Sequence, residues 1–386
     1  MEWKLHGRTD VTKDISVIGG SAAGFFTAYL LAKQGLDVRV FEATERIDPS
    51  PRTLIVTRYM QGLLGPLGES AVINEIRHFE LFTDGRAATI SLQRPDMVIE
   101  RSNLIRKLAE KAEASGAKIL TGRRFLSLKP NGKSLKFAVS CKGDREPAEE
   151  STEILVGADG AFSKVARSIG WPETPTLPLI QAVVDLPEDL SPDTTRIWFI
   201  PEETPYFFWL IPHSPTQGVL GLIGEDPEES RRSLERLVEE KSLAATDFQS
   251  ARIPLYTRWI DNHQKIGKSD VYLVGDAAGH VKVSTVGGVV TGLRGALGVV
   301  EAILNGGSSR QLQALRRELD RHRLIRRVLH GFTQADYSGL LDMLTASTKR
   351  CLGLFPRDET SKLLFHLLLK QPRLLLLRLR ALLIGK

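Results

Sequence analysis

The chain has 386 residues, of which 42% are hydrophobic and 25% charged, and it carries a formal net charge of +6. The composition is that of a globular protein and excludes a disordered chain. The length is sufficient for two or three packed units. Only two cysteines occur, Cys141 and Cys351, without paired spacing, so we expect neither a disulfide framework nor a bound metal. The polar first residues contain no apolar core of signal-peptide length, and we expect a cytoplasmic protein.

The positive charge is concentrated at the C-terminal end. Residues 361–386 contain six basic side chains among many leucines and no acidic side chain. A nucleic-acid-binding protein would spread basic residues over a folded face, and we expect no nucleic-acid partner. No apolar run approaches the roughly 20 residues that span a bilayer, and Pro372 interrupts the segment. We favour an interfacial segment in peripheral contact with anionic lipid on the inner face of the membrane over a core or dimer helix.

The first strong pattern lies at residues 14–42. An apolar strand from Ile15 to Ile18 leads into a glycine turn, a helix of small residues follows to about Lys33, and a second apolar strand ends at Glu42. This order is typical of a dinucleotide-binding crossover. The alternative is a crossover of the same kind without a nucleotide.

The turn of this crossover contains the residue types that a pyrophosphate needs. Gly19 permits the sharp turn, a small residue at 21 allows the backbone to approach the phosphates, and Gly24 lets the helix lie close to the sheet. Ser21 stands where the fingerprint has its middle glycine, and serine is still small. We expect the helix N-terminus to bind phosphates and Glu42 to accept hydrogen bonds from a ribose. The expected cofactor-binding residues here are Gly19, Ser21, Ala22, Ala23, Gly24 and Glu42.

The following segment alternates as strands do. Residues 72–99 contain Asp84-Gly85, a strong hairpin signal between two such runs. The apolar spacing from 101 to 115 predicts a helix that ends at Gly116. Residues 122–150 read as antiparallel strands, with the clearest turn at Asn131-Gly132.

The second half repeats the pattern of an apolar strand followed by a glycine turn. It occurs at 151–170 and again at 270–279, with a strand-rich stretch between them and a charged helix of about twenty residues after Asp226. A glycine-bearing helix is expected over roughly 286–304, and residues 308–386 read as helical and basic.

Parallel-sheet units separated by strand-rich insertions imply an α/β protein with a discontinuous nucleotide-binding domain. We expect a Rossmann-like nucleotide-binding domain, an inserted mixed β-sheet substrate domain and a C-terminal helical, basic region. The expected bounds are 1–60, 98–175 and 266–306 for the first, 61–97 and 176–265 for the second, and 307–386 for the third.

Two further constellations end buried strands with a carboxylate. Asp159 lies in a Gly-Ala-Asp-Gly turn that is followed by Ser163 and Arg167, and Asp276 lies in Gly275-Asp276-Ala277-Ala278-Gly279. Asp159 could instead serve only to cap the helix that follows it. Downstream, Gly287-Gly288 open a helix whose N–H groups suit an anionic or electron-rich ring edge.

These three motifs, in this order and spacing, resemble the FAD-dependent oxidoreductases that include aromatic hydroxylases, tryptophan halogenases and geranylgeranyl reductases. The resemblance covers residues 14 to about 305. It implies that the first motif holds the ADP half of FAD, that Glu42 holds the ribose, that Arg101 contacts the cofactor and that Asp276 reaches the ribityl chain. With Asp159, Gly275, Gly287 and Gly288, these residues complete the expected FAD site.

Within that group, the segment 275–288 is most similar to geranylgeranyl reductases. Lys282, Ser284, Thr285 and Gly287-Gly288 fit, whereas Val283 replaces the usual proline and Val286 one of the usual glycines. Residues 206–212 also look like that family's substrate-domain motif, although halogenases carry a similar segment and a buried strand could have the same composition. No lysine occurs between Lys33 and Lys107, which argues against halogenation, and the cysteine that some reductases place soon after the ribose-binding acid is absent.

The resemblance implies reduction of an isolated prenyl double bond by hydride from reduced flavin, with a proton added to the neighbouring carbon. A dry, aromatic-lined cavity suits the cation-like carbon of such a reaction. Phe207 and Trp209 are expected to line it beside Gly287 and Gly288. The proton donor is open among His280, His213 and Tyr206, each of which could be structural instead.

Three hypotheses on function follow. The first is a geranylgeranyl reductase-like enzyme acting on an isoprenoid or membrane lipid. The second is an FAD-dependent monooxygenase that hydroxylates or epoxidises a lipophilic substrate, and the third is a non-catalytic flavin-containing partner of a lipid-synthesis complex. No second glycine fingerprint exists, so the electrons would come from a transiently bound NAD(P)H or from a carrier protein.

Overall fold

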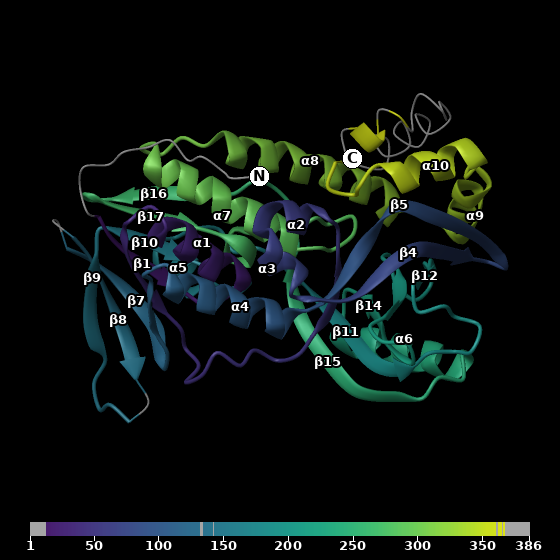
Figure 1. Cartoon of the computed structure of the whole chain (residues 1–386), viewed down its shortest axis with the longest axis horizontal. Coiled ribbons are helices and arrows are strands. Elements are labelled where there is room, and N and C mark those ends of the chain that lie inside the picture. The colour runs from purple at the N-terminus through teal and green to yellow at the C-terminus, as the bar shows by residue number, and fades with distance from the viewer. Residues whose placement is uncertain (1–12, 132–133, 142, 360–361, 365, 367–386) are drawn as a thin grey trace.

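A computed structural model describes residues 13–131, 134–141, 143–359, 362–364 and 366 (Figure 1). A six-stranded sheet, sheet A, has the strand order β16-β17-β10-β1-β2-β6, and all its pairs are parallel except β16 with β17. Its strands are β1 (Asp14–Ile18), β2 (Asp37–Phe41), β6 (Lys118–Leu120), β10 (Ile154–Gly157), β16 (His263–Ile266) and β17 (Ser269–Leu273). The parallel pairing of β1 with β10 and of β10 with β17 confirms the prediction drawn from the three strand-and-turn units.

Sheet A lies between helices and a small antiparallel sheet (Figure 1). Apolar side chains of β1, Ile15 and Val17, pack with three helices, α1 (Ala22–Ala32), α4 (Arg101–Ala114) and α7 (Val289–Leu304). On the other face Ile18 and Leu155 pack with Phe137 of a three-stranded sheet, which consists of β7 (Arg123–Asn131), β8 (Ser134–Cys141) and β9 (Ala148–Thr152). Both faces are therefore covered, as a parallel sheet requires.

A second large sheet, sheet B, has the strand order β15-β11-β14-β13-β12-β4-β5-β3. Its strands are β3 (Thr53–Val56), β4 (Val72–Thr83), β5 (Arg86–Glu100), β11 (Thr176–Asp185), β12 (Thr194–Trp198), β13 (Phe208–Pro212), β14 (Gln217–Ile223) and β15 (Ala245–Pro254). One face packs on Leu234 and Leu237 of helix α6 (Pro227–Glu240). The other face, which we call the apolar face, includes Ile76, Trp209 and Val219 and contacts Leu352 of helix α10 (Ala346–Leu354).

The remaining helices connect these sheets or follow them. Helix α8 (Arg310–His330) lies along α7, and α9 (Gln334–Asp342) and α10 reach over the β4–β5 hairpin (Figure 1). Short helices are α2 (Tyr59–Leu64), α3 (Pro66–Glu69), α5 (Lys164–Ser168) and the 3₁₀ turn η1 (Gly275–Ala278).

Most expected elements are confirmed, with small shifts. The hairpin turns at Asp84-Gly85, and α4 ends before Gly116, which has a positive φ. Helix α6 begins after Asp226, whose side chain accepts two N–H groups of the first turn, but it spans 14 residues and not about twenty. It ends where Ser242 takes a positive φ before β15. Helix α7 begins at Val289 and not at 286, because 282–288 form a separate loop.

Other expectations are not tested by the fold. The domain bounds stay a prediction, and the turn at Asn131-Gly132 and most of the basic segment 361–386 lie outside the described residues. Among the described helices none is both long and apolar enough to cross a membrane.

Candidate functional site

The glycine turn after β1 is a close contact between three backbone segments. Gly19 has φ +105°, and a Cβ there would lie 2.6 Å from the carbonyl oxygen of Ala158. A Cβ on Gly24 would lie 2.2 Å from the carbonyl oxygen of Gly19. Ser21 is the N-cap of α1, and its hydroxyl oxygen accepts the Gly24 N–H at 3.1 Å. Serine at this position is therefore a helix cap as well as a small residue.

The carboxylate of Glu42 is held beside this turn. One oxygen accepts the Gly20 N–H at 2.6 Å, and the other accepts the backbone N–H and the hydroxyl of Thr44 at 2.8 and 2.9 Å. A carboxylate has about four acceptor positions, so one stays available for a ribose hydroxyl. The geometry thus fits the expected role of Glu42 as an acceptor for a ribose hydroxyl, and the three hydrogen bonds explain why its side chain is fixed.

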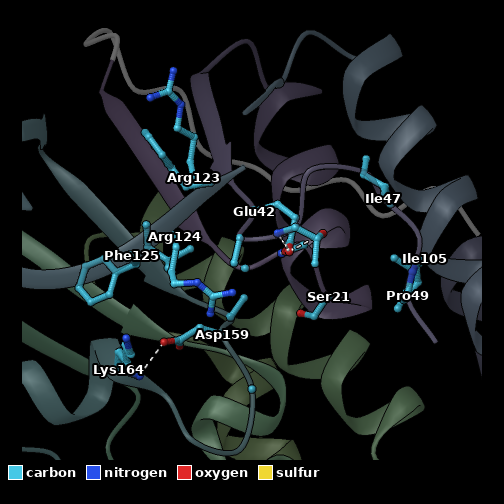
Figure 2. Close-up of a pocket in the computed structure, with 18 of the residues that line it drawn as sticks. Ser21, Glu42, Ile47, Pro49, Ile105, Arg123, Arg124, Phe125, Asp159 and Lys164 are labelled. Carbon is cyan, nitrogen blue, oxygen red and sulfur yellow. Dashed lines mark hydrogen bonds between the residues drawn. The ribbon is translucent and has the colours of Figure 1, made fainter. Parts of the chain in front are cut away.

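A cavity of about 470 Å³ opens at this end of sheet A (Figure 2). It brings together five of the predicted residues, which are Gly19, Ser21, Glu42, Arg101 and Asp159. The helix-opening residues Ala22 and Ala23 adjoin it through Ser21, and the first N–H groups of a helix have no partner within the helix. Sequence reasoning missed the basic residues of its wall, Arg123, Arg124 and Lys164, because their positions at a strand start and a helix start gave no motif.

The carboxylate of Asp159 accepts three hydrogen bonds from the protein itself. Its two oxygens accept the hydroxyl of Ser163 at 2.6 Å and the N–H groups of Lys164 and Val165 at 2.7 and 3.1 Å. The helix-capping role that the sequence left open is therefore present. Burial raises the pKa of Asp159, and the hydrogen bond from Ser163 counteracts this effect. A contact with FAD stays a prediction. Arg167, the other residue of this motif, lines the same cavity.

Asp276, in η1, faces two arginines. Its side chain is exposed, yet the surrounding protein raises its pKa by desolvation, which the charges of Arg101 and Arg52 oppose. The buried Nε of Arg52 has no hydrogen-bond partner among the described residues, and burial lowers the pKa of this arginine. Arg52 was missed from the sequence, where it was one residue of a proline-containing connection.

The loop of residues 282–288, which we call the α7 loop, lies directly beside Asp276. A Cβ on Gly288 would be 3.3 Å from the Asp276 Oδ1 atom, and the Lys282 N–H bonds the Gly287 carbonyl at 3.1 Å. Val286 has φ +49°, a conformation that strongly disfavours a β-branched residue. Val286 is thus strained at the position where the resemblance implies a glycine. Lys282, Ser284 and Thr285 belong to the same loop.

The predicted aromatic pair lies at the start of β13, with Phe207 just before the strand and Trp209 within it. Phe207 and Trp209 belong to the apolar face of sheet B, with ring centroids 6.0 Å apart, whereas Phe208 points to the α6 side. The Trp209 ring fills the space over Gly221, where a Cβ would lie 2.6 Å from it. Val286 of the α7 loop packs against this same face. The α7 loop therefore packs against the same apolar face as the aromatic pair.

One of the three candidate proton donors is corrected. His280 is fully buried, its Nδ1 atom accepts the Gly275 N–H at 3.3 Å and its Nε2 atom contacts the Asn262 amide at 3.0 Å. Burial lowers its pKa to about 3. His280 is a neutral packing residue against η1 and Trp259, and it cannot protonate a substrate.

Tyr206 and His213 differ in access. Tyr206 is buried beneath the Arg326 guanidinium, 4.2 Å from its ring centroid, and burial raises its pKa. His213 is half-buried after β13, and its Nδ1 atom has no hydrogen-bond partner in the part of the chain that the structure describes. Desolvation lowers the pKa of His213, and Glu100, which also acts on Arg52 and Arg101, raises it.

These residues fit FAD. The backbone turn, the acceptor on Glu42 and the Arg101 guanidinium line the cavity and match a diphosphate and a ribose. Arg52 acts with Arg101 on Asp276, and its Nε is a donor without an acceptor among the described residues. Asp276 and the glycines of the α7 loop continue the site toward the apolar face.

Comparison with known proteins agrees with this geometry. The family described as FAD binding domain matches residues 12–324. The geranylgeranyl diphosphate reductase of Rhodobacter capsulatus is 26% identical over 317 residues, 78% of each chain. A geranylgeranyl bacteriochlorophyll reductase-like protein from Thermoplasma acidophilum has the same fold, with a TM-score of 0.76, 18% identity, and coverage of 93% of this chain and 96% of that one.

The fold is shared with oxygen-using enzymes. The flavin-dependent monooxygenase PieE, solved with FAD and substrate, gives a TM-score of 0.62 at 15% identity, over 93% of this chain and 72% of that one. The match over most of the chain and the fit of the site lead to one conclusion. The chain belongs to the FAD binding domain family and is an FAD-dependent oxidoreductase similar to geranylgeranyl reductases.

Proposed function

We propose that this enzyme saturates C=C bonds of a prenyl, geranylgeranyl-type lipid or isoprenoid. The observation that carries the proposal is the contact between Val286 of the α7 loop and the apolar face that contains Phe207 and Trp209. An apolar, aromatic surface next to the flavin-facing loop suits an extended hydrocarbon chain. The name of the Rhodobacter capsulatus relative supports the same substrate class.

The chain's own residues would exclude water and stabilise charge. FAD, when bound, supplies the hydride that reduces one carbon of the double bond. Phe207 and Trp209 would stabilise the positive charge that develops on the neighbouring carbon, and contacts of a cation with an aromatic ring contribute about 0.5–2 kcal/mol. Helix α7 begins after Gly288, beside Asp276, and the free N–H groups of its first turn would stabilise negative charge on the cofactor.

His213 is the best supported donor of the proton that the reaction consumes. It is half-buried, whereas Tyr206 and His280 are both buried. Desolvation lowers the pKa of His213, but the charge of Glu100 raises it, and Glu100 also acts on Arg52 of the cofactor site. These features support His213 as the general acid.

A monooxygenase is the second candidate, because the fold is shared with PieE and the same apolar face could hold another lipophilic substrate. The two functions differ in their need for oxygen. The enzyme, reduced with dithionite and freed of oxygen, is incubated with geranylgeranyl diphosphate, and the product is analysed by mass spectrometry. A product with two added hydrogen atoms supports the reductase, whereas a product that forms only with O₂ and contains one added oxygen atom would support the monooxygenase.

We also propose that NAD(P)H or a carrier protein supplies the electrons. A separate proposal is peripheral membrane contact through residues 361–386. The support for membrane contact is the run of basic residues among leucines. Deletion of residues 372–386 is expected to weaken binding to liposomes that contain anionic lipid. Equal binding of both forms would exclude the membrane contact.

A further inference from the structure

The α7 loop is tied to the C-terminal region by a buried ion pair. The Lys282 ammonium lies 2.5 Å from the Asp358 Oδ1 atom, and their side chains are only 6% and 0% exposed. The other oxygen of Asp358 accepts the hydroxyl of Thr57. Asp358 follows α10 and lies beyond residue 324, where the family match ends.

A second buried contact ties the same loop to α8. The Ser284 hydroxyl lies 2.6 Å from His322 Nδ1, and His322 Nε2 lies 3.4 Å from Glu318 Oε1. Burial lowers the pKa of His322, so the ring is neutral and has one N–H. That N–H serves best on Nε2 facing the Glu318 carboxylate, which leaves Nδ1 to accept the Ser284 O–H.

Both contacts fix the conformation of the glycine-containing part of the loop. The Lys282 ammonium lies 3.8 Å from the point where a Cβ on Gly287 would be. The backbone N–H of Lys282 donates a hydrogen bond to the Gly287 carbonyl. Val283, between the two tied residues, packs with Leu315 and Leu319 of α8. The strained φ of Val286 is retained within this restrained segment.

We infer that Asp358, His322 and Glu318 are positioning residues, which hold the α7 loop through Lys282 and Ser284 in the conformation that binds FAD. Residues outside the nucleotide-binding motifs, from α8 and from the segment after α10, thereby determine cofactor affinity. The inference concerns FAD binding and needs no substrate, so it stands or falls separately from the proposed function.

The expected effect follows from the population of the binding-competent loop. Removing one partner of a buried ion pair leaves the other charged and uncompensated, which favours loop conformations that release it to solvent. The apparent dissociation constant of FAD rises in inverse proportion to the fraction of competent molecules, so that a fall to about one tenth raises it about tenfold.

The test compares three variants in the full-length protein. Asp358→Asn removes the charge that pairs with Lys282, and Ser284→Ala removes one hydroxyl with little change in volume. The control, Glu80→Gln, breaks the ion pair of Glu80 with Arg196, 3.0 Å apart, on the α6 side of sheet B. For each variant we would measure the melting temperature without FAD, the dissociation constant of FAD by flavin fluorescence, and the visible circular dichroism and midpoint potential of bound flavin.

We expect the dissociation constant to rise about tenfold for Asp358→Asn and about fivefold for Ser284→Ala, which loses one buried hydrogen bond. In both of these variants the visible circular dichroism and the midpoint potential of bound flavin should also change, whereas Glu80→Gln should change only the melting temperature. If Asp358→Asn does not fold, Ser284→Ala decides the outcome alone. Dissociation constants within about twofold of wild type and unchanged flavin spectra would show that the contacts only support the fold, and would overturn the inference.

Discussion

The close approach of α1 to β1 gives a direct test of the cofactor site. In Gly24→Ala, the new Cβ would lie 2.2 Å from the Gly19 carbonyl oxygen and 3.0 Å from the Ala158 Cβ, whereas ordinary contact begins at 3.4 Å. The helix N-terminus must therefore move by roughly 1 Å away from the turn, and overpacking of this kind costs about 1–3 kcal/mol. The same movement displaces the N–H groups at Ala22 and Ala23, so we expect FAD affinity to fall at least about tenfold.

Gly62→Ala is the matched control. Gly62 also lies within a helix, α2, but a Cβ there meets nothing within 4 Å. Since alanine favours a helix over glycine by about 0.5–1 kcal/mol, this variant should be slightly more stable than wild type and bind FAD unchanged. The assays are urea unfolding and FAD titration by fluorescence. Wild-type stability and FAD affinity in Gly24→Ala would refute the reasoning.

Three further predictions follow from the site. In Arg52→Met, loss of a half-buried guanidinium whose Nε has no partner among the described residues should leave the apoprotein as stable as wild type. The same titration should show FAD binding weakened about tenfold, and equal affinity would exclude Arg52 from the cofactor site. Phe207→Leu should lower kcat on a prenyl substrate about fivefold with an unchanged FAD dissociation constant, and an unchanged kcat would remove the aromatic ring from the reaction. Burial lowers the pKa of His280 from 6.5 to about 3. Below about pH 6.5 the unfolded chain therefore takes up a proton on this residue, whereas the folded chain does not. The free energy of unfolding should accordingly fall by up to about 1.4 kcal/mol per pH unit on acidification. Unfolding curves between neutral pH and pH 5 should show a smaller dependence in His280→Asn, and an equal dependence would contradict this assignment.

The strand-and-turn units were predictable because their signals are local. Apolar runs that end in glycine turns predicted β1, β10 and β17, and a parallel sheet brings the ends of such strands to one edge. The gathering of Gly19, Glu42 and Asp159 around one cavity follows from that arrangement. The alternation along β13 likewise separated Trp209 from Phe208.

The partners of individual side chains were not predictable. Asp159 carries the same motif whether it caps α5, contacts a cofactor or does both, and only the structure shows that it accepts hydrogen bonds from Ser163 and Lys164. His280 follows a functional motif, yet its ring is enclosed by η1 and α7. The pairing of Lys282 with Asp358 joins residues 76 positions apart, and no local pattern encodes such a contact.

The oxidation of flavin by substrate tests the central claim most directly. The enzyme is reduced, freed of oxygen and mixed with geranylgeranyl diphosphate in a stopped-flow instrument while the absorbance of oxidised flavin is recorded. The account predicts that oxidised flavin forms without oxygen, in equal amount to the double bonds saturated, and that this step slows in Phe207→Leu. Flavin that stays reduced until oxygen is admitted would contradict it.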